Sequence, residues 1–368
     1  MSNGGVSVNL EGKRILVTGG TGSLGRTAVR RLLTGEMGRP AKITVFSRDE
    51  AKQHYMRLSY LNRKAATDEI IYRNFQELLS FRIGDIRDYS SVLQAVREAD
   101  VVIHAAALKQ VPTCEYFPFQ AVQTNILGAQ NLVRAICENA TPVETVVGIS
   151  TDKACKPINA MGMTKALMER ILIEANMECP STRFVCVRYG NVIASRGSVV
   201  PLFLEQISKG GPVTITTKEM TRFLLTLDQA VDTVFAAIRG ALPGEIYVPK
   251  VPAARILDLA EVLINGKDIP IVYTGIRPGE KIHEIMVSEE EVYRTVERDG
   301  YYVICPMLPE LRPVSGSEVA ATAEHEGCKY KPALTGEYSS ANVTLDYDGL
   351  RELLAPYLAG QLPEEVLA

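Results

Sequence analysis

The chain has 368 residues, of which 46% are hydrophobic, and its formal net charge is −3. This length and hydrophobic content suffice for a large core or for two unequal lobes that share a cleft. Lys and Arg total 40 against 43 Asp and Glu, with no basic stripe, which argues against a nucleic-acid partner. No apolar run approaches the roughly 20 residues that span a bilayer, and the start lacks a secretory signal. We therefore expect a cytoplasmic protein with no membrane partner.

Seven cysteines and four histidines are scattered along the chain. None of the cysteines forms a CxxC pair, and their odd number argues against a closed disulfide framework. The histidines are equally dispersed, so metal-ligand spacing is absent and we expect no metal site.

Short β-branched runs alternate with longer amphipathic stretches through the first 200 residues. We expect strands at 14–19, 42–47, 78–85, 100–106, 145–150 and 183–190, with helices at about 119–138 and 159–176. The strands are nearly continuous apolar runs, which indicates helices on both faces of the sheet. The pattern predicts an α/β fold with a Rossmann-type, doubly wound parallel sheet. The two helices are also candidates for a dimer interface.

Beyond residue 200 the elements become shorter and are interrupted by Gly and Pro. Strands are expected at 213–216, 245–250 and 269–275, and helices near 227–240 and 254–265. We expect an NADP-binding domain over 1–200, to which residues 225–250 return, and a smaller α/β substrate-binding lobe mainly over 201–310. Residues 311–368 are predicted to form an exposed tail and then a docking helix.

A glycine-rich segment, GGTGSLG, follows the first strand and precedes a helix. Gly19, Gly22 and Gly25 allow a tight turn and a close approach of the backbone to a pyrophosphate at the helix N-terminus. The strand before it and the helix after it favour a dinucleotide site over a merely structural turn. The expected cofactor contacts in this loop are Gly19, Thr21, Gly22, Ser23, Leu24 and Gly25.

The second strand ends in FSRDE, without the carboxylate that would grip the ribose of NAD. Ser47 and Arg48 occupy that place. Arg48 can meet a 2′-phosphate, which favours NADP over NAD, and a solvated loop charge is the alternative role.

Two further strand ends supply candidate cofactor contacts. In GDIRD, Asp85 and Ile86 are suited to hydrogen-bond and flank an adenine. The small side chains of Ala105, Ala106 and Ala107 would let the backbone lie against the nicotinamide half, and simple packing is the alternative.

The segment MGMTK, residues 161–165, lies in the stretch of a dinucleotide-binding fold where a short-chain dehydrogenase would normally place a Tyr four residues before a Lys. Met161 removes the phenol that usually takes a proton from a sugar hydroxyl, because a thioether has no acidic proton. STDK, residues 150–153, stands just upstream and offers a hydroxyl, a carboxylate and an amine. The pattern indicates that the acid–base chemistry has moved to these groups, while Met161 can equally be a packing residue.

Together these motifs resemble the extended short-chain dehydrogenase/reductases, specifically the UDP-N-acetylglucosamine 4,6-dehydratase group of bacterial polysaccharide, capsule and flagellin-sugar biosynthesis. The resemblance covers roughly residues 12–290 and rests on GGTGSLG, GDIRD, HAAALKQVPTCE, TNILGAQNL, STDKACKPINAMGMTK, RYGNVIASRGSVVPLF, MTRF and IRPGEKIHE. It implies a lyase with tightly held NADP. Sugar C4 would be oxidised, water eliminated across C5 and C6, and hydride returned to C6.

The resemblance also implies catalytic roles. Lys165 would bind the nicotinamide ribose and supply positive charge near the reacting hydroxyl. Asp152 would protonate the departing C6 oxygen and Lys153 would take the C5 proton, unless the two form only a surface ion pair. Thr151 would orient the C4 hydroxyl or cap a turn. With Met161 in the Tyr position, Asp152 through a water, or Thr151 with Lys165, are the candidates to deprotonate that hydroxyl.

The same resemblance implies a nucleotide-sugar substrate whose diphosphate is held by arginines. Arg222 and Arg277 are the strongest candidates, with structural salt bridges as the alternative. The full expected set, in which Lys109 lies near the sugar, is Lys109, Asn191, Arg196, Ser198, Val199, Arg222, Arg277 and Glu280.

Three alternatives stay open beside the UDP-N-acetylglucosamine dehydratase. One is a dehydratase of GDP-N-acetylglucosamine. A nucleotide-sugar epimerase would usually want a Tyr at position 161 and would not need the Asp152–Lys153 pair. A non-catalytic NADP-binding sensor or scaffold would have no reason to keep STDK, Lys165 and the arginines. For each we expect a homo-oligomer, a dimer or higher.

Overall fold

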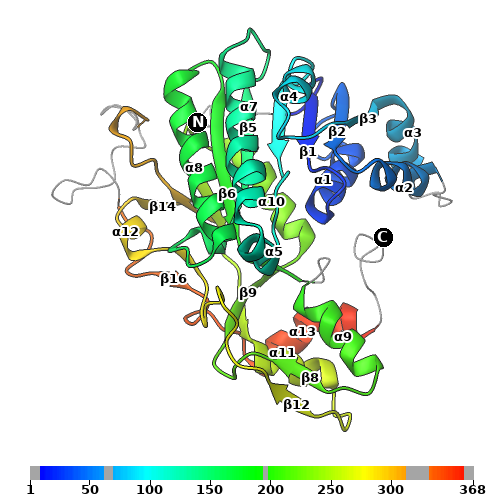
Figure 1. Ribbon diagram of the computed structural model, residues 1–368, viewed down its shortest axis with the longest axis vertical. Helices are drawn as coiled ribbons and strands as arrows, with labels where there is room; N and C mark the ends of the chain where they lie inside the picture. The colour runs from blue at the N-terminus through cyan, green and yellow to red at the C-terminus, as the bar shows by residue number, and fades with distance from the viewer. Residues whose placement is uncertain (1–8, 62–68, 194–197, 312–330, 360–368) are drawn as a thin grey trace, which may run out of the picture.

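The computed structural model describes residues 9–61, 69–193, 198–311 and 331–359 (Figure 1). Its larger part is built on one sheet of β1 (Arg14–Thr18), β2 (Lys42–Ser47), β3 (Leu79–Ile83), β4 (Val101–His104), β5 (Thr145–Thr151), β6 (Arg183–Tyr189), β10 (Ile246–Pro249), β14 (Thr295–Arg298) and β15 (Tyr301–Ile304).

The order of this nine-stranded sheet is β14-β15-β10-β6-β5-β4-β1-β2-β3. All neighbours from β3 to β10 pair in parallel, and β15 and β14 join antiparallel at the β10 edge. The strand order reverses between β1 and β4, which is the point where doubly wound sheets bind ligands. The predicted Rossmann-type sheet is confirmed.

Helices cover both faces because successive strand side chains point to opposite sides. In β1, Ile15 and Val17 belong to one hydrophobic cluster and Leu16 to another. The first cluster includes α1 (Ser23–Thr34), α2 (Glu50–Leu61), α3 (Glu69–Leu78) and α10 (Leu227–Gly240). The second includes α4 (Tyr89–Val96), α7 (Gly128–Cys137) and α8 (Ala160–Glu178).

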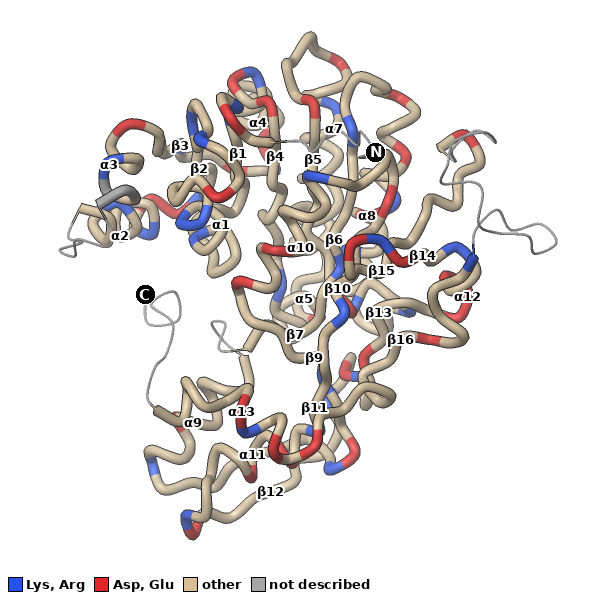
Figure 2. The backbone as a smooth tube through the Cα atoms, turned by 180° about the vertical axis from the view of Figure 1, so that it is seen from behind, with Lys and Arg blue, Asp and Glu red and all other residues tan. Residues whose placement is uncertain are grey.

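A smaller lobe lies beyond the large sheet (Figures 1 and 2). Its core is an apolar cluster between α9 (Val199–Ser208), α11 (Ile256–Ile264) and α13 (Tyr347–Leu358). The remaining strands are β7 (Asn191–Val192), β8 (Val213–Ile215), β9 (Thr221–Leu225), β11 (Ala253–Arg255), β12 (Ile271–Tyr273), β13 (Ile285–Val287) and β16 (Tyr338–Ser339). They form the small sheets β11-β9-β7, β12-β8 and β13-β16.

Several expected elements differ in extent. The expected helix at 119–138 consists of α6 (Pro118–Ala121), a π-helical segment η2 (Val122–Leu127) and α7. Residues 295–304, expected in the substrate-binding lobe, form β14 and β15 and extend the large sheet, since β15 pairs with β10. The docking helix expected near the C-terminus corresponds to α13, which buries Leu350 and Leu354 against α11. Most of the expected exposed tail lies outside the described residues.

No helix within the described ranges combines the length and the apolar content that a bilayer crossing requires.

One buried ion cluster ties the large sheet to the later part of the chain. Arg188 in β6 donates to Glu169 of α8 at 2.7 and 3.0 Å and to Glu291 of α12 (Glu289–Val292) at 2.8 and 3.1 Å. It also donates to the carbonyl oxygen of Met286 in β13 at 2.8 Å. Burial alone would raise the pKa of Glu291, but Arg188 outweighs it and the pKa falls to about 2. Glu291 is therefore charged at neutral pH.

Replacing Arg188 with Met is expected to lower the free energy of unfolding by about 3–5 kcal/mol, because two buried carboxylates lose their cation. Urea denaturation followed by circular dichroism measures this loss. Arg134→Met is the matched control, since Arg134 forms an exposed pair with Glu138 and exposed pairs contribute little. Equal urea midpoints for the two variants would contradict the assigned role of Arg188.

Candidate functional site

The glycine-rich loop lies against the end of β4. Gly19 has φ 66°, and a Cβ added there would lie 2.7 Å from the backbone nitrogen of Ala106. Gly22 is the N-cap of α1 and offers no side chain to its backbone N–H groups. A helix N-terminus of this kind is suited to bind a phosphate group. The structure thus brings together the loop and Ala105–Ala106, which were predicted separately.

The ends of β2 and β3 also meet. Ser47 is buried and its Oγ accepts from Gln53 Nε2 at 3.0 Å. Arg48 Nη1 lies 3.7 Å from Asp85 Oδ2, which also accepts from Arg87 at 2.6 Å. Burial opposes ionisation of Asp85, but the Arg87 hydrogen bonds lower its pKa. Ile86 is buried and packs beside Gly128 of α7, so its side chain belongs to the core.

Lys165 of α8 is buried close to the carboxyl ends of β4 and β5. Its Nζ donates to the carbonyl oxygen of Ile149 at 2.7 Å. Burial lowers the pKa of Lys165 to about 8. His104 is fully buried nearby, with Nδ1 2.9 Å from Thr18 Oγ1, and burial together with the Lys165 charge lowers its pKa to about 3. His104 is therefore neutral, and its Nε2 has no hydrogen-bond partner among the described residues.

The STDK segment forms a buried turn. Thr151 ends β5 and caps the 3₁₀ turn η3 (Asp152–Ala154), while its Oγ1 donates to Asp152 Oδ1 at 2.9 Å. The same oxygen accepts from Lys153 Nζ at 3.0 Å. The side chain of Asp152 is 0% exposed and that of Lys153 is 19% exposed. The pair is thus not a surface ion pair, and Asp152 Oδ2 has no partner within the described part of the chain.

Groups from two later segments lie beside Lys153. Glu284 Oε1 lies 3.4 Å from Lys153 Nζ, and Asn191 Oδ1 accepts from the same nitrogen at 3.5 Å. Burial acts against the charge of Lys153, but Asp152 and Glu284 raise its pKa. Burial also raises the pKa of Glu284, and Lys153 only partly offsets it. The sequence analysis did not assign Glu284, although the last residue of the quoted IRPGEKIHE motif marks it.

Met161 occupies an apolar pocket. It is buried with Cys114 and Ala121, and Leu108 and Val111 pack against them. Its thioether therefore fills space beside the site, as a packing residue does.

The start of α8 is fixed by its own residues. Asn159 caps it by accepting from the backbone N–H of Gly162 at 2.7 Å and donates to the carbonyl oxygen of Gly279 at 2.7 Å. A Cβ added to Gly162 would lie 2.2 Å from the carbonyl oxygen of Lys153. The spacing between STDK and MGMTK is thus set by backbone contact.

Asn125 is a further residue that the sequence analysis missed. It lies in η2, is fully buried, and exchanges hydrogen bonds with the backbone of Leu108 at 2.8 and 3.0 Å. It also donates to Thr164 Oγ1 in α8 at 2.9 Å. Single π-helical turns often occur at functional sites. In the sequence, Asn125 stands directly before the apolar Ile126 and Leu127 in TNILGAQNL.

The two arginines expected at the diphosphate have different surroundings. Arg222 is buried and donates to the carbonyl oxygens of Thr221, Lys281 and Ile282 at 2.7–3.1 Å. Arg277 is exposed, with Nη1 3.9 Å from Glu280 Oε1.

Three other members of that set have simple placements. Ser198 caps α9 and Val199 begins it, while Lys109 lies between β4 and α5 (Val111–Tyr116). Arg196 lies outside the described residues. A role for this set in binding the diphosphate stays a prediction.

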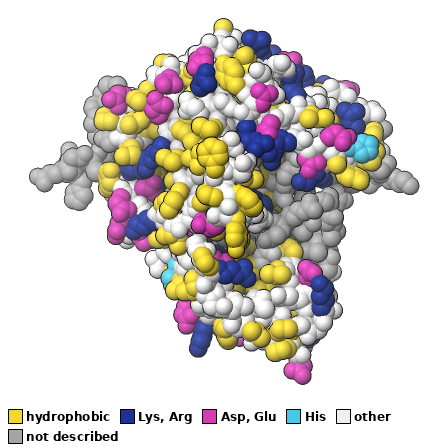
Figure 3. All heavy atoms as spheres, in the orientation of Figure 1, with side chains coloured by type: hydrophobic (Ala, Val, Ile, Leu, Met, Phe, Trp, Pro, Cys, Tyr) yellow, Lys and Arg dark blue, Asp and Glu magenta, His cyan; other side chains and the backbone are white. Residues whose placement is uncertain are grey.

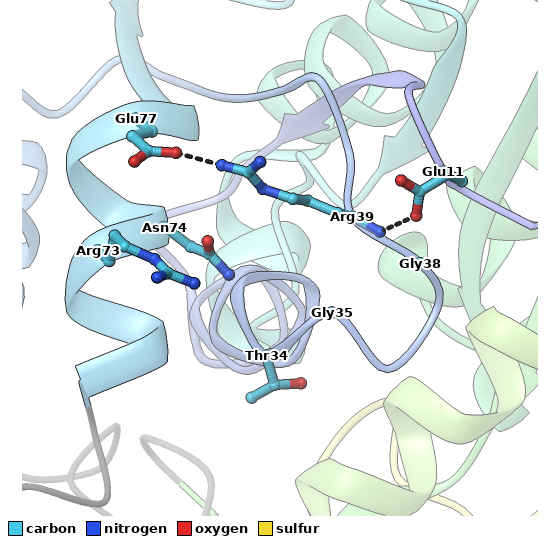
Figure 4. A pocket seen from close by; sticks show the side chains of 8 residues that line it. All are labelled: Glu11, Thr34, Gly35, Gly38, Arg39, Arg73, Asn74 and Glu77. Atoms are coloured by element: carbon cyan, nitrogen blue, oxygen red, sulfur yellow. Dashed lines mark hydrogen bonds and ion pairs between the residues drawn. The ribbon is translucent and has the colours of Figure 1, made fainter.

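A separate pocket of about 570 Å³ lies near the amino-terminal ends of β1, β2 and β3, where α1 ends (Figure 4). Arg39 crosses it, pairing with Glu77 and donating its backbone N–H to Glu11 at 2.6 Å. None of the predicted site residues lines this pocket, so we do not assign it to the site.

Comparisons with known proteins identify the family and the fold. Residues 15–306 match the family described as polysaccharide biosynthesis protein. A UDP-glucose 4-epimerase of Rickettsia prowazekii (strain Madrid E) is 42% identical over 348 residues, which cover 93% of this chain and 95% of the relative. The crystal structure of Pen from Bacillus thuringiensis has a TM-score of 0.79 and 32% identity, covering 96% of this chain and 98% of Pen. DesIV, a dTDP-glucose 4,6-dehydratase from Streptomyces venezuelae, shares the fold, with a TM-score of 0.61, 21% identity and coverage of 73% and 86%.

The contact between Gly162 and Lys153 predicts the outcome of a single methyl group. Gly→Ala within a helix normally stabilises by about 0.5–1 kcal/mol. At position 162 we expect the reverse, with a lower melting temperature and a loss of activity, since the methyl group would displace η3. Differential scanning fluorimetry measures the melting temperature, and the rate at which the enzyme converts its nucleotide sugar measures the activity. Gly336→Ala is the control, because a Cβ there meets nothing within 4 Å. A Gly162→Ala variant as active and stable as the wild type would refute the contact.

Proposed function

This chain belongs to the polysaccharide biosynthesis protein family of extended short-chain dehydrogenase/reductases, and on that premise we propose that it is a nucleotide-sugar 4,6-dehydratase. The proposed substrate is UDP-N-acetylglucosamine and the product its 4-keto-6-deoxy derivative. The observation that carries the proposal is the buried Asp152–Lys153 pair at the end of β5. Elimination of water needs both an acid and a base beside the sugar, and the pair offers both.

A dinucleotide cofactor fits the residues present. The Gly19 turn and the N-terminus of α1 form a cradle for a pyrophosphate, into which a side chain at position 19 would not fit. NADP supplies a hydride acceptor and donor when bound. We propose NADP over NAD because Arg48 stands at the end of β2, where a 2′-phosphate would be held.

Lys165 supplies positive charge near the carboxyl end of β5. Its ammonium is held by the carbonyl oxygen of Ile149 and is available for a ribose hydroxyl. Its lowered pKa, about 8, also lets it share protons near neutral pH.

Lys153 is an ammonium in the resting pair, because Asp152 and Glu284 raise its pKa, and its Nζ donates to Asp152 Oδ1. A proton passing from Lys153 Nζ to Asp152 across 3.0 Å produces a neutral amine and a carboxylic acid. The amine then takes the proton from sugar C5. The acid gives its proton to the C6 oxygen, which leaves as water. Both groups thereby return to their first charge states. Over the whole cycle, the proton lost from the C4 hydroxyl is balanced by the proton that C5 takes up when hydride returns to C6.

An epimerase is the second candidate, favoured by the name of the Rickettsia relative. Inversion at C4 needs a base at the C4 hydroxyl but no acid at C6. Here Met161 offers no acidic proton, whereas the fully buried Asp152 has an oxygen, Oδ2, without a partner among the residues that the structure describes. A buried carboxylate is costly unless it is paired or used. The geometry therefore supports elimination better than epimerisation.

We also propose that two copies associate through the face made by α5, α6, η2 and α8. These elements contact one another, and their exposed apolar side chains are Tyr116, Phe117, Phe119, Leu127, Met163 and Leu167. Figure 3 shows hydrophobic side chains gathered over the centre of this face. A contiguous exposed apolar patch marks an interaction site, and an isologous dimer would cover it with the same patch of a second copy.

The function is tested by incubating the protein with UDP-N-acetylglucosamine in deuterated water, without added cofactor. Mass spectrometry and proton NMR are expected to show loss of one water, a new C6 methyl group and deuterium at C5. Asp152→Asn is expected to slow this roughly 100- to 10,000-fold, the usual contribution of a general acid, whereas the exposed Asp228→Asn is not. A product of unchanged mass, epimerised at C4, would contradict the dehydratase and support the second candidate.

The dimer predicts that Phe119→Glu with Leu167→Glu yields a single-chain mass by light scattering, since two charges would enter an apolar contact. The wild type and Tyr55→Glu, which changes an exposed residue of α2, are expected to keep the mass of at least two chains. A wild type that is monomeric at micromolar concentration would exclude this interface.

A further inference from the structure

Glu284 has no role in the reaction described above, yet it is one of the most deeply buried carboxylates near the site. Its side chain is 2% exposed. Oε1 lies 3.4 Å from Lys153 Nζ and 3.9 Å from Arg222 Nε. Oε2 has no hydrogen-bond partner among the described residues. A carboxylate placed this way must have its burial offset by charge alone.

Lys153 therefore faces two buried carboxylates. Asp152 belongs to its own turn, and Glu284 arrives from the segment before β13. Each leaves one oxygen without a partner in the described structure, Oδ2 and Oε2 respectively. A cation between two acceptors is held in place more strictly than a cation with one. The direction of Lys153 Nζ is thus fixed by both.

The segment that carries Glu284 is attached to the STDK region at several points. Lys281 Nζ donates to the carbonyl oxygen of Cys155 at 2.6 Å, and Asn159 holds the carbonyl oxygen of Gly279. Arg222 donates to the carbonyl oxygen of Lys281 at 2.9 Å. The position of Glu284 therefore follows from a built network of backbone contacts.

We infer that Glu284 is a positioning residue for the proposed elimination, holding the amino group of Lys153 beside Asp152 and toward the substrate. This role rests on the proposed function, and Glu284 itself makes or breaks no covalent bond in the reaction. The charged groups that face Glu284 are Asp152, Lys153, Arg222 and Lys281. Of these, Asp152 and Lys153 exchange protons in the proposed reaction, and Lys153 is the cation of that pair.

The test compares Glu284→Gln with Glu284→Asp and with the control Glu289→Gln, which removes an exposed carboxylate paired with Lys156. Glu284→Gln is expected to lower kcat for dehydration roughly 10- to 100-fold, as loss of a supporting partner does. KM is expected to stay within about twofold of the wild type, since the nucleotide contacts are intact. Glu284→Asp, which keeps the charge, is expected to recover part of kcat.

A second readout does not depend on turnover. Acylation of Lys153 by acetic anhydride, followed by peptide mass spectrometry across pH, reports where this amine loses its proton. Because the Glu284 charge raises the pKa of Lys153, the midpoint of labelling is expected at lower pH in Glu284→Gln, while Glu289→Gln matches the wild type. A merely structural residue would change the folded fraction but not this midpoint.

The outcomes separate the two proposals. A wild type that releases no water from the sugar nucleotide overturns the proposed function, and the labelling midpoint then still decides whether Glu284 holds Lys153. An unchanged kcat and an unchanged midpoint in Glu284→Gln overturn the role of Glu284. If Glu284→Gln does not fold, Glu284→Asp carries the test, with the midpoint expected at or near that of the wild type and kcat reduced by the shorter reach.

Discussion

The guanidinium of Arg188 joins β6 to α8 through Glu169 and to α12 through Glu291. Helix α8 carries Lys165 near its start, and the chain that leads into β13 carries Glu284. Since a buried charge cannot give up its partners without a large penalty, the two segments are held at one fixed relation. The acid–base groups at the end of β5 lie between them, so their distances depend on this cluster.

The fold also explains how Met161 is accommodated where a Tyr is usual. Met161 fills an apolar pocket. The groups that can move protons lie in the neighbouring turn η3, and Gly162 packs against that turn because it has no side chain. The carboxylate and ammonium of η3 are buried, and burial strengthens electrostatic interactions between them. A site with this arrangement concentrates its acid–base capacity away from the usual position in the fold.

Much of the fold was predictable from local pattern. The parallel strands read as continuous apolar runs because both faces are buried, and the glycine-rich loop identified the switch point. STDK and MGMTK are close in sequence and in space. Glu284 could not be placed beside Lys153, because the approach depends on how a distant loop packs. Arg222 donates to the carbonyl oxygens of Lys281 and Ile282, and these partners could not be foreseen from its motif; its contact with a diphosphate stays a prediction. Strands β14 and β15 are too short to show by periodicity which sheet they join.

The proposed dehydration depends most on where the hydrogen of sugar C4 goes. UDP-N-acetylglucosamine carrying deuterium at C4 would answer this with one NMR spectrum of the product. The proposed dehydratase function predicts deuterium in a new C6 methyl group, because oxidation at C4, elimination by Asp152 and Lys153, and return of hydride to C6 would occur in one site. Deuterium found again at C4, with the C6 hydroxyl intact, would contradict elimination and leave Asp152 and Lys153 as structural groups of an epimerase.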